Sequence, residues 1–134
     1  MNNMLQNWIL LDIFEKLSLN ELVKMELVNT FLKEMIRKTI WSHLIKLKKI
    51  ENIKYVVENY KFIKYDFGYS TVNYDIVKLL GNCRELNLSS CKQITDESVK
   101  LLGNCHTLNL SGCKKITDES VKLLGNCHIL NHSC

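Results

Sequence analysis

The chain has 134 residues and a formal net charge of +4, with 46% apolar and 24% charged residues. This size fits one compact domain, or two small modules that share a core, and argues against a large multi-step enzyme. Charged side chains interrupt every apolar stretch, and the first residues lack the pattern of a secretory signal. We therefore expect a cytoplasmic or nuclear protein without a membrane span.

The excess of positive charge lies in one short segment. Residues 45–64 hold six Lys against two Glu, whereas basic and acidic residues balance on either side of this segment. Nucleic-acid binding usually requires a larger basic face with interleaved aromatic residues. We therefore predict that these lysines form a solvated face and that the chain binds no nucleic acid.

Residues 1–44 have apolar side chains at helical spacing and predict a domain of three short helices. Ser18 and Glu21 have the spacing of a capping box, so the second helix should begin after a tight turn. A bundle this small cannot bury all of its apolar side chains, so some must face another protein or the rest of the chain. The three apolar stripes are Leu5, Ile9, Leu10, Ile13, Phe14 and Leu17; Leu22, Met25, Leu27 and Val28; and Phe31, Leu32, Met35 and Ile36.

The following segment leads into a repeated region. A fourth helix is predicted over residues 39–49 by the spacing of Ile40, Trp41, Leu44 and Leu47. Residues 45–76 then connect this helix to the repeats. Within this connection, residues 60–65 repeat the apolar spacing of residues 83–88 at an offset of 23 and predict a degenerate first repeat, with a strand near residues 62–66.

Residues 77–134 consist of repeats with a period of 22 residues. Residues 77–98 and 99–120 are identical at 18 of 22 positions, and a truncated third copy begins at residue 121. In the first copy Leu86 and Leu88 alternate as in a strand, and Thr95 can cap a short helix. Stacking of the copies predicts an α/β fold, with a parallel sheet of about four strands on one side and short helices on the other.

The N-terminal helices resemble the F-box family, through residues 5–17 (LQNWILLDIFEKL), 21–25 (ELVKM), 27–29 (LVN) and Trp41. The repeats resemble the cysteine-containing subtype of leucine-rich repeat, in which Leu-x-Leu-Ser-x-Cys precedes Ile-Thr-Asp. Together these resemblances imply a substrate-recognition adaptor of an SCF-type cullin-RING ubiquitin ligase. The F-box would dock on a Skp-family linker protein, and the repeats would bind a client protein. The scarcity of Pro and Ala, with many Asn and Lys, is similar to proteins of giant DNA viruses of amoebae, which would place the chain in the host cytoplasm.

Two sets of residues are candidates for binding these partners. The resemblance implies that the linker contacts, or their direct support, come from Leu5, Ile9, Leu10, Ile13, Phe14, Leu17, Leu22 and Val28. Among these we expect Leu5, Ile9 and Phe14 to face the linker, whereas Leu10, Leu22 and Val28 fit the core equally well. Alternation along the strands predicts a neutral client-binding strip made of Glu85, Asn87, Ser89, Thr107, Asn109, Ser111, Ile129 and Asn131.

The cysteines follow the repeat and form no Cys-x-x-Cys pair of the kind that zinc sites use. We therefore expect buried structural thiols, with no metal and no cofactor. His106 follows Cys105, but neighbours on a strand point to opposite faces and cannot form a nucleophile and base pair. No set of residues supports an enzyme. The six cysteines are Cys83, Cys91, Cys105, Cys113, Cys127 and Cys134.

Two alternatives to the adaptor remain open at this point. The chain could be a free-standing repeat scaffold whose helical head caps the array without contacting a ligase, or it could be a degenerate relic. The last copy stops at Cys134 within an expected strand. We therefore expect this strand to fray or to pair with another molecule.

Overall fold

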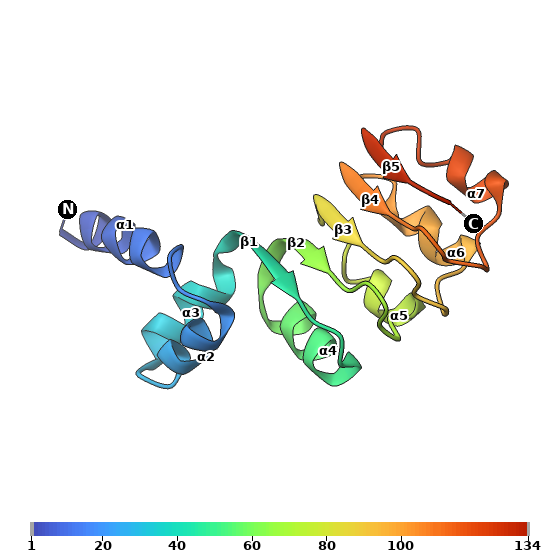
Figure 1. The fold of residues 1–134 in the computed structure, drawn as a ribbon. Helices are drawn as coiled ribbons and strands as arrows, with labels where there is room; N and C mark the ends of the chain where they lie inside the picture. Colours follow the sequence, from blue (N-terminus) through green and yellow to red (C-terminus); the bar gives the residue numbers. More distant parts are fainter. Residues whose placement is uncertain (1, 134) are drawn as a thin grey trace.

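The computed structural model describes residues 2–133, so Met1 and Cys134 lie outside the described residues. The side chains of residues 2–6 and of Ile129 also lie outside this description, together with the expectations for Leu5, Ile129 and Cys134. Three helices come first, and strands then alternate with helices (Figure 1). The elements are α1 (Asn2–Phe14), α2 (Leu19–Glu26), α3 (Thr30–Lys38), β1 (Ile40–Lys46), α4 (Ile50–Asn59), β2 (Lys61–Asp66), α5 (Tyr74–Val77), β3 (Glu85–Asn87), α6 (Asp96–Val99), a 3-10 turn (Lys100–Leu102), β4 (Thr107–Asn109), α7 (Asp118–Lys122) and β5 (Ile129–Asn131).

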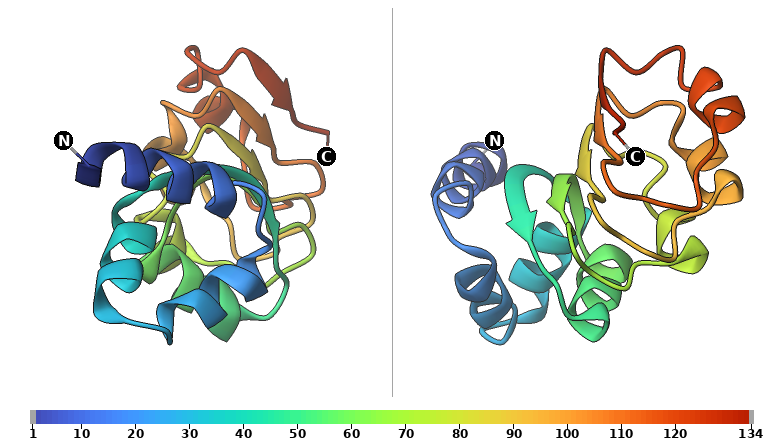
Figure 2. Two further views of the ribbon diagram at one scale, coloured as in Figure 1. Left: turned by 90° about the vertical axis from the view of Figure 1, so that its left-hand side faces the viewer. Right: turned by 45° about the vertical axis from the view of Figure 1, so that its right-hand side comes forward.

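The strands form one parallel sheet in the order β1-β2-β3-β4-β5, with α4 to α7 along one side of it (Figures 1 and 2). Equivalent residues of successive units pair across the sheet, because Tyr65 lies beside Leu86 and Leu86 lies beside Leu108. These three side chains are buried between the sheet and the helices. The expected α/β fold with a parallel sheet and flanking helices is therefore present in the repeated region.

Residues 39–49 do not form the predicted fourth helix, because residues 40–46 form strand β1. Trp41 and Ile45 point into the core, whereas the neighbouring Ile40 and Leu44 are exposed. Pairing with β2 satisfies the backbone of this segment, and tertiary contacts therefore outweigh its helical apolar spacing. The helix begins only at Ile50. As a result the sheet has five strands rather than about four.

The strand expected near residues 62–66 is confirmed as β2. It receives β1 on one side and β3 on the other, so the repeated architecture begins well before the copies that are recognisable in the sequence. The first unit has a helix of 10 residues, α4, whereas the later units have helices of only four or five residues. The first unit thus stacks its strand as the later units do, but its helix is longer than theirs.

The three N-terminal helices predicted from the apolar stripes are present, and side chains cap the N-terminal ends of α2 and α3. Ser18 and Glu21 form the expected capping box at α2, with the Ser18 N–H donating to Glu21 Oε2 over 2.8 Å. Between α2 and α3, Arg37 Nε and Nη2 donate to the two carboxylate oxygens of the buried Glu26 over 2.9 and 3.1 Å. This bidentate pair raises the pKa of Arg37 and fixes the two helices relative to each other.

The helices and the sheet share one continuous core. Phe14, at the end of α1, lies against Trp41 of β1 with ring centroids 6.4 Å apart. The Trp41 Nε1–H donates to the backbone oxygen of Ile36 over 2.9 Å, which ties α3 to the same strand. The helical unit is consequently attached to the β1 end of the sheet (Figure 1). Within residues 2–133, none of the helices has the length and apolar character needed to cross a membrane.

This core predicts different effects for two neighbouring residues of α1. Replacing the buried Phe14 in Phe14→Ala should lower the free energy of unfolding by about 3–5 kcal/mol, because the ring contacts are lost and a cavity remains. Ile13 is nearly half exposed, so Ile13→Ala should change it by about 0.5 kcal/mol or less. Urea unfolding followed by Trp fluorescence measures both, and equal losses would contradict the arrangement.

Candidate functional site

Large apolar side chains are exposed on the N-terminal helices. On α1, Trp8 is 70% exposed and Ile9 is 60% exposed, with the half-exposed Ile13 one turn further along. A second group lies at the turn between α2 and α3 and at the start of α3. Exposed apolar side chains gathered on one small unit are typical of a protein interaction site. We call the six residues of both groups the helical surface: Trp8, Ile9, Ile13, Leu27, Val28 and Phe31.

A surface pocket of about 290 Å³ lies between α1 and α3. Its lining includes Asn7 from α1 and Phe31 from α3, with Met35 one turn further along α3. The pocket therefore joins the two helices that carry most of the helical surface. Glu34, Lys38 and Thr39 complete the lining, so a partner side chain that enters the pocket would meet polar as well as apolar groups.

The structure divides the predicted linker-binding residues into three groups. Ile9, Ile13 and Val28 are exposed, whereas Leu10 and Leu17 are half-buried and pack against the core. Phe14 and Leu22 are completely buried. The expectation that Phe14 faces the linker is wrong, because the end of α1 turns this ring onto Trp41. Phe14 therefore anchors the end of α1 to β1.

Sequence reasoning missed Trp8, which belongs to none of the apolar stripes, and it assigned Leu27 and Phe31 to helix stripes without placing them at a surface. Trp8 immediately precedes the exposed Ile9, in the middle of α1 and away from its buried end at Phe14. A large aromatic residue outside the apolar stripe of a helix is itself a sign of an external partner. That sign was available in the sequence.

The strip predicted for the client lies on the side of the sheet opposite the helices. The register places Glu85 beside Thr107 and Asn87 beside Asn109, so equivalent residues of successive copies do form rows. Asn131 of β5 continues the second row. The structure therefore brings the described members of this strip together across three strands.

Hydrogen bonds within the chain already engage the Asn residues of this strip. Asn87 Nδ2 donates to Asp66 Oδ1 over 2.9 Å, while its Oδ1 accepts from the Ser89 N–H over 2.9 Å. The Asn109 Oδ1 likewise accepts from the Ser111 N–H over 3.0 Å. These side chains hold the turns that follow β3 and β4. Their amides contribute more to the fold than to an external partner.

The cysteines lie in columns, one from each unit, as their spacing predicts. Cys83, Cys91, Cys105 and Cys113 are buried, and Cys127 is half-buried. The thiol of Cys113 donates to the Leu88 oxygen over 3.1 Å and that of Cys91 to the Phe67 oxygen over 3.2 Å, so each thiol satisfies a carbonyl of the preceding unit.

The pKa values of three of these thiols are raised, away from reactivity, whereas the hydrogen bond with Cys83 lowers the pKa of Cys105. Burial raises the pKa of Cys91 and of Cys113, and the hydrogen bond with Cys105, followed by burial, raises the pKa of Cys83. Such thiols stay protonated near neutral pH and are weak nucleophiles. Across residues 2–133, no cluster of three or more His, Cys, Asp or Glu side chains is placed to hold a metal ion.

Cys105 and His106, which directly precede β4, make different contacts. The Cys105 thiol is buried and donates to the Thr107 oxygen over 3.1 Å. His106 instead stacks on His128 at the start of the neighbouring strand, with ring centroids 4.4 Å apart and an angle of 9° between the rings. The two rings continue the stacking of equivalent residues in successive units, and their contact is with each other rather than with the thiol.

At the start of α7, an acidic residue of the preceding copy takes the place of the predicted Thr cap. Thr95 and Thr117 make no side-chain capping bond at α6 and α7. Asp96 of one copy accepts hydrogen bonds from the Thr117 N–H, the Thr117 hydroxyl and the Ser120 hydroxyl of the next, over 2.8, 2.8 and 2.7 Å. These bonds lower the pKa of Asp96. The copies are therefore joined on the helical side as well as through the sheet.

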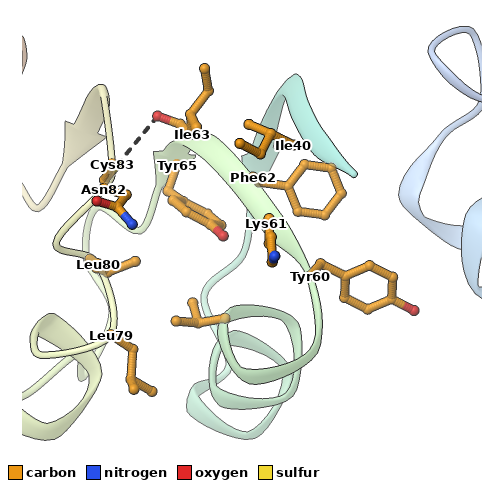
Figure 3. A pocket seen from close by; sticks show the side chains of 11 residues that line it. Ile40, Tyr60, Lys61, Phe62, Ile63, Tyr65, Leu79, Leu80, Asn82 and Cys83 are labelled. Carbon is orange, nitrogen blue, oxygen red and sulfur yellow. Dashed lines mark hydrogen bonds between the residues drawn. The ribbon is translucent and has the colours of Figure 1, made fainter. Parts of the chain in front are cut away.

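A second pocket of about 290 Å³ lies between β2, α4 and α5 (Figure 3). Apolar side chains such as Phe62 and Leu80 form most of its lining, and Lys61 is its one charged lining residue. The Cys83 thiol at its edge is already bonded to the Ile63 oxygen over 3.4 Å.

Residues 84–103 and 106–125 match the leucine-rich repeat family. The match covers the two copies that contain β3 and β4, and residues 1–83 lie outside it. Neither the curated proteins nor the solved structures include a match to this chain. Leucine-rich repeats stack into extended surfaces that bind other proteins. The repeats of this chain accordingly indicate a role in protein–protein interaction.

The Asp96 bridge between repeats predicts a pH-dependent contribution to stability. Asp96→Ala should lower the midpoint of thermal unfolding by a few degrees, because α7 loses its cap. The folded-state pKa lies below the ordinary value of 3.8, so this contribution is present above that pH and is lost as the pH falls through the folded-state pKa. Circular dichroism melts of both proteins should therefore converge in acid.

Asp118 provides a matched control for this measurement. It is the equivalent residue one repeat later, is exposed, and bonds to no later repeat within residues 2–133. Asp118→Ala should leave the melting curve almost unchanged at neutral pH. If both variants lose the same stability, the bridge does not stabilise the array.

Buried, protonated cysteines predict slow chemical labelling of the folded protein. In a Cys134→Ser background, a thiol reagent near neutral pH should react at least about tenfold more slowly than it does in urea. Cys127, which is less buried than the others, should be labelled first. Mass spectrometry after timed quenching measures the order, and rapid labelling of Cys105 in the folded state would instead indicate a reactive thiol.

Proposed function

We propose that this chain is a substrate-recognition adaptor of an SCF-type ubiquitin ligase. The helical surface docks on a Skp-family linker protein, and the leucine-rich repeats hold the client. The observation that supports this proposal is the exposure of large apolar side chains on α1 and at the α2–α3 turn, represented by Trp8, Ile9 and Leu27. Burial of such side chains in an interface contributes about 25 cal/mol per Å² of apolar area.

The rigidity of the helical surface also supports docking. Phe14 and Leu22 are fully buried beneath it, and the pair formed by Glu26 and Arg37 joins α2 to α3. A partner that binds here therefore does not have to order the helices first, and the entropic cost of association is reduced. The F-box resemblance of residues 5–29 and the exposed positions within it lead to the same proposal.

The arrangement of the two parts suits an adaptor. The N-terminal helices lie at the β1 end of the sheet, and the repeats extend away from them to β5 (Figure 2). A linker on the helices and a client on the outward face of the sheet would contact different elements. Because helices and sheet share one core, the distance between two such partners would be fixed.

A second candidate is a repeat scaffold that makes no contact with a ligase. It is favoured by the contacts between the end of α1 and β1, where Phe14 covers Trp41 and Glu15 Oε2 accepts from the Ser42 hydroxyl over 3.5 Å. These contacts cap the edge of the array, which is a sufficient structural role for α1. They do not account for the exposed Trp8 and Ile9, so we favour the adaptor.

Charge placed on the helical surface should weaken linker binding without unfolding the protein. The variant Ile9→Asp with Ile13→Asp should weaken the affinity for a Skp-family linker at least about tenfold, which corresponds to about 1.4 kcal/mol. Calorimetric titration measures this loss. Leu123→Asp, which adds a charge at an equally exposed apolar site beside α7, is the control and should bind normally.

Phe14→Ala cannot serve in this test, because it weakens the core as well as any interface. Unchanged circular dichroism of the double variant confirms that its fold is intact. If the wild-type protein fails to bind the linker at micromolar concentration, the adaptor proposal is rejected and the scaffold becomes the better description.

A further inference from the structure

The outward face of the sheet changes character from one end to the other. The row that contains Glu85 and Thr107 begins with Leu44 of β1 and Lys64 of β2, and the row of Asn87 begins with Lys46 and Asp66. From β3 onward, the second row repeats the same residue, with Asn87, Asn109 and Asn131 side by side. Among the side chains that the structure describes, the β1–β2 end displays apolar, basic and acidic groups together, which is the variety that a selective binding surface requires.

An aromatic ring is displayed at this end by a left-handed backbone. Tyr69 has a φ of 62°, and the equivalent residues of the next two units, Ser90 and Gly112, have φ values of 58° and 73°. In each unit this residue's N–H donates to a carbonyl of the next unit, over 2.7 to 2.8 Å. The fold therefore requires a left-handed residue at this turn, and small residues fill it in the later units.

Tyr69 is an unfavourable choice for that position, because a bulky side chain with a positive φ is strained. Its ring is 74% exposed, so it adds little to the core. Lys48 lies over this ring, with its Nζ 5.6 Å from the ring centroid. The ring and the ammonium group are thus held together on the surface before any partner arrives.

The lysines at this end include two that have no acidic partner. Lys64 is paired with Glu85 over 3.0 Å, and Asp66 is engaged by the Asn87 side chain and the Gly68 N–H. Lys46 and Lys48 are exposed, and within the described chain neither has a carboxylate within 4.0 Å. Their charge is available to an external carboxylate or phosphate.

We propose that Lys46, Lys48 and Tyr69, with Leu44 beside them, bind an acidic segment of a protein. The lysines attract its carboxylates, while Leu44 and the Tyr69 ring each offer an apolar contact. Two unpaired cations beside an apolar residue are too few for the long phosphate track of a nucleic acid. This assignment adds a binding site to the proposed function. The role of the bound protein as a client rests on that proposed function.

Fluorescence anisotropy with a short fluorescein-labelled peptide of Glu-Glu-Leu repeats tests the site. The wild-type chain should bind this peptide at low ionic strength and lose it as salt is added. Lys46→Glu with Lys48→Glu should weaken binding about tenfold or more. Lys92→Glu with Lys114→Glu, which makes the same change of charge at exposed lysines of the later repeats, should stay within about twofold of wild type.

Tyr69→Gly separates a binding role from a structural one. Gly accepts the left-handed backbone without strain, so this variant should melt at the same or a higher temperature than wild type while binding the peptide about threefold more weakly. A lower melting temperature with unchanged binding would show that the ring serves the fold, and would overturn its place in the site.

Two further outcomes would also overturn the proposal. One is equal weakening by both pairs of charge reversals, because binding would then follow net charge alone. The other is tighter binding of a labelled oligouridylate of the same charge than of the peptide, because the site would then prefer nucleic acid. Linker binding, measured on the same variants, should be unaffected, so loss of the adaptor function and loss of this site remain distinguishable.

Discussion

The contact between Phe14 and Trp41 is the point on which the arrangement of the whole chain depends. It joins helices too small to form a substantial core of their own to the exposed edge of a parallel sheet. Because the buried side of α1 is anchored there, Ile9 and Ile13 are held on its outer side. One aromatic pair thus closes the edge of the array and also determines which apolar residues remain available to another protein.

The sequence was most informative where it repeats. A 22-residue period and the alternation of Leu86 and Leu88 were sufficient to predict strands, their register and a column of buried thiols. Identity between copies could not reveal the bridge from Asp96 to Ser120, since contacts between residues 24 positions apart depend on how neighbouring helices are offset. The local capping rule selected Thr95 and its equivalent Thr117, whereas the bonds at the start of α7 go to Asp96 of the preceding copy.

The errors lie at the junction between the helices and the repeats. Ile40, Trp41, Leu44 and Leu47 satisfy helical spacing, yet the backbone pairs with β2 and only Trp41 and Ile45 of the strand turn fully inward. Phe14 shares its stripe with Ile9, and spacing alone cannot show that the end of a helix is covered while its middle is open. For the same reason, the site at Lys46, Lys48 and Tyr69 could not be recognised from the copies, because it is formed where the repeats have diverged.

The bridge from Asp96 to Thr117 has a consequence for how such a chain can change its length. Each full 22-residue unit contains both sets of residues that make this bridge. They are an aspartate that can bond to the next unit, and a threonine and a serine that can bond to the aspartate of the preceding unit. A tandem duplication of one unit would therefore insert a unit that can form this bridge with both of its neighbours. Growth or shrinkage by whole units needs no compensating mutation, whereas the diverged first turns of the sheet are free to specialise.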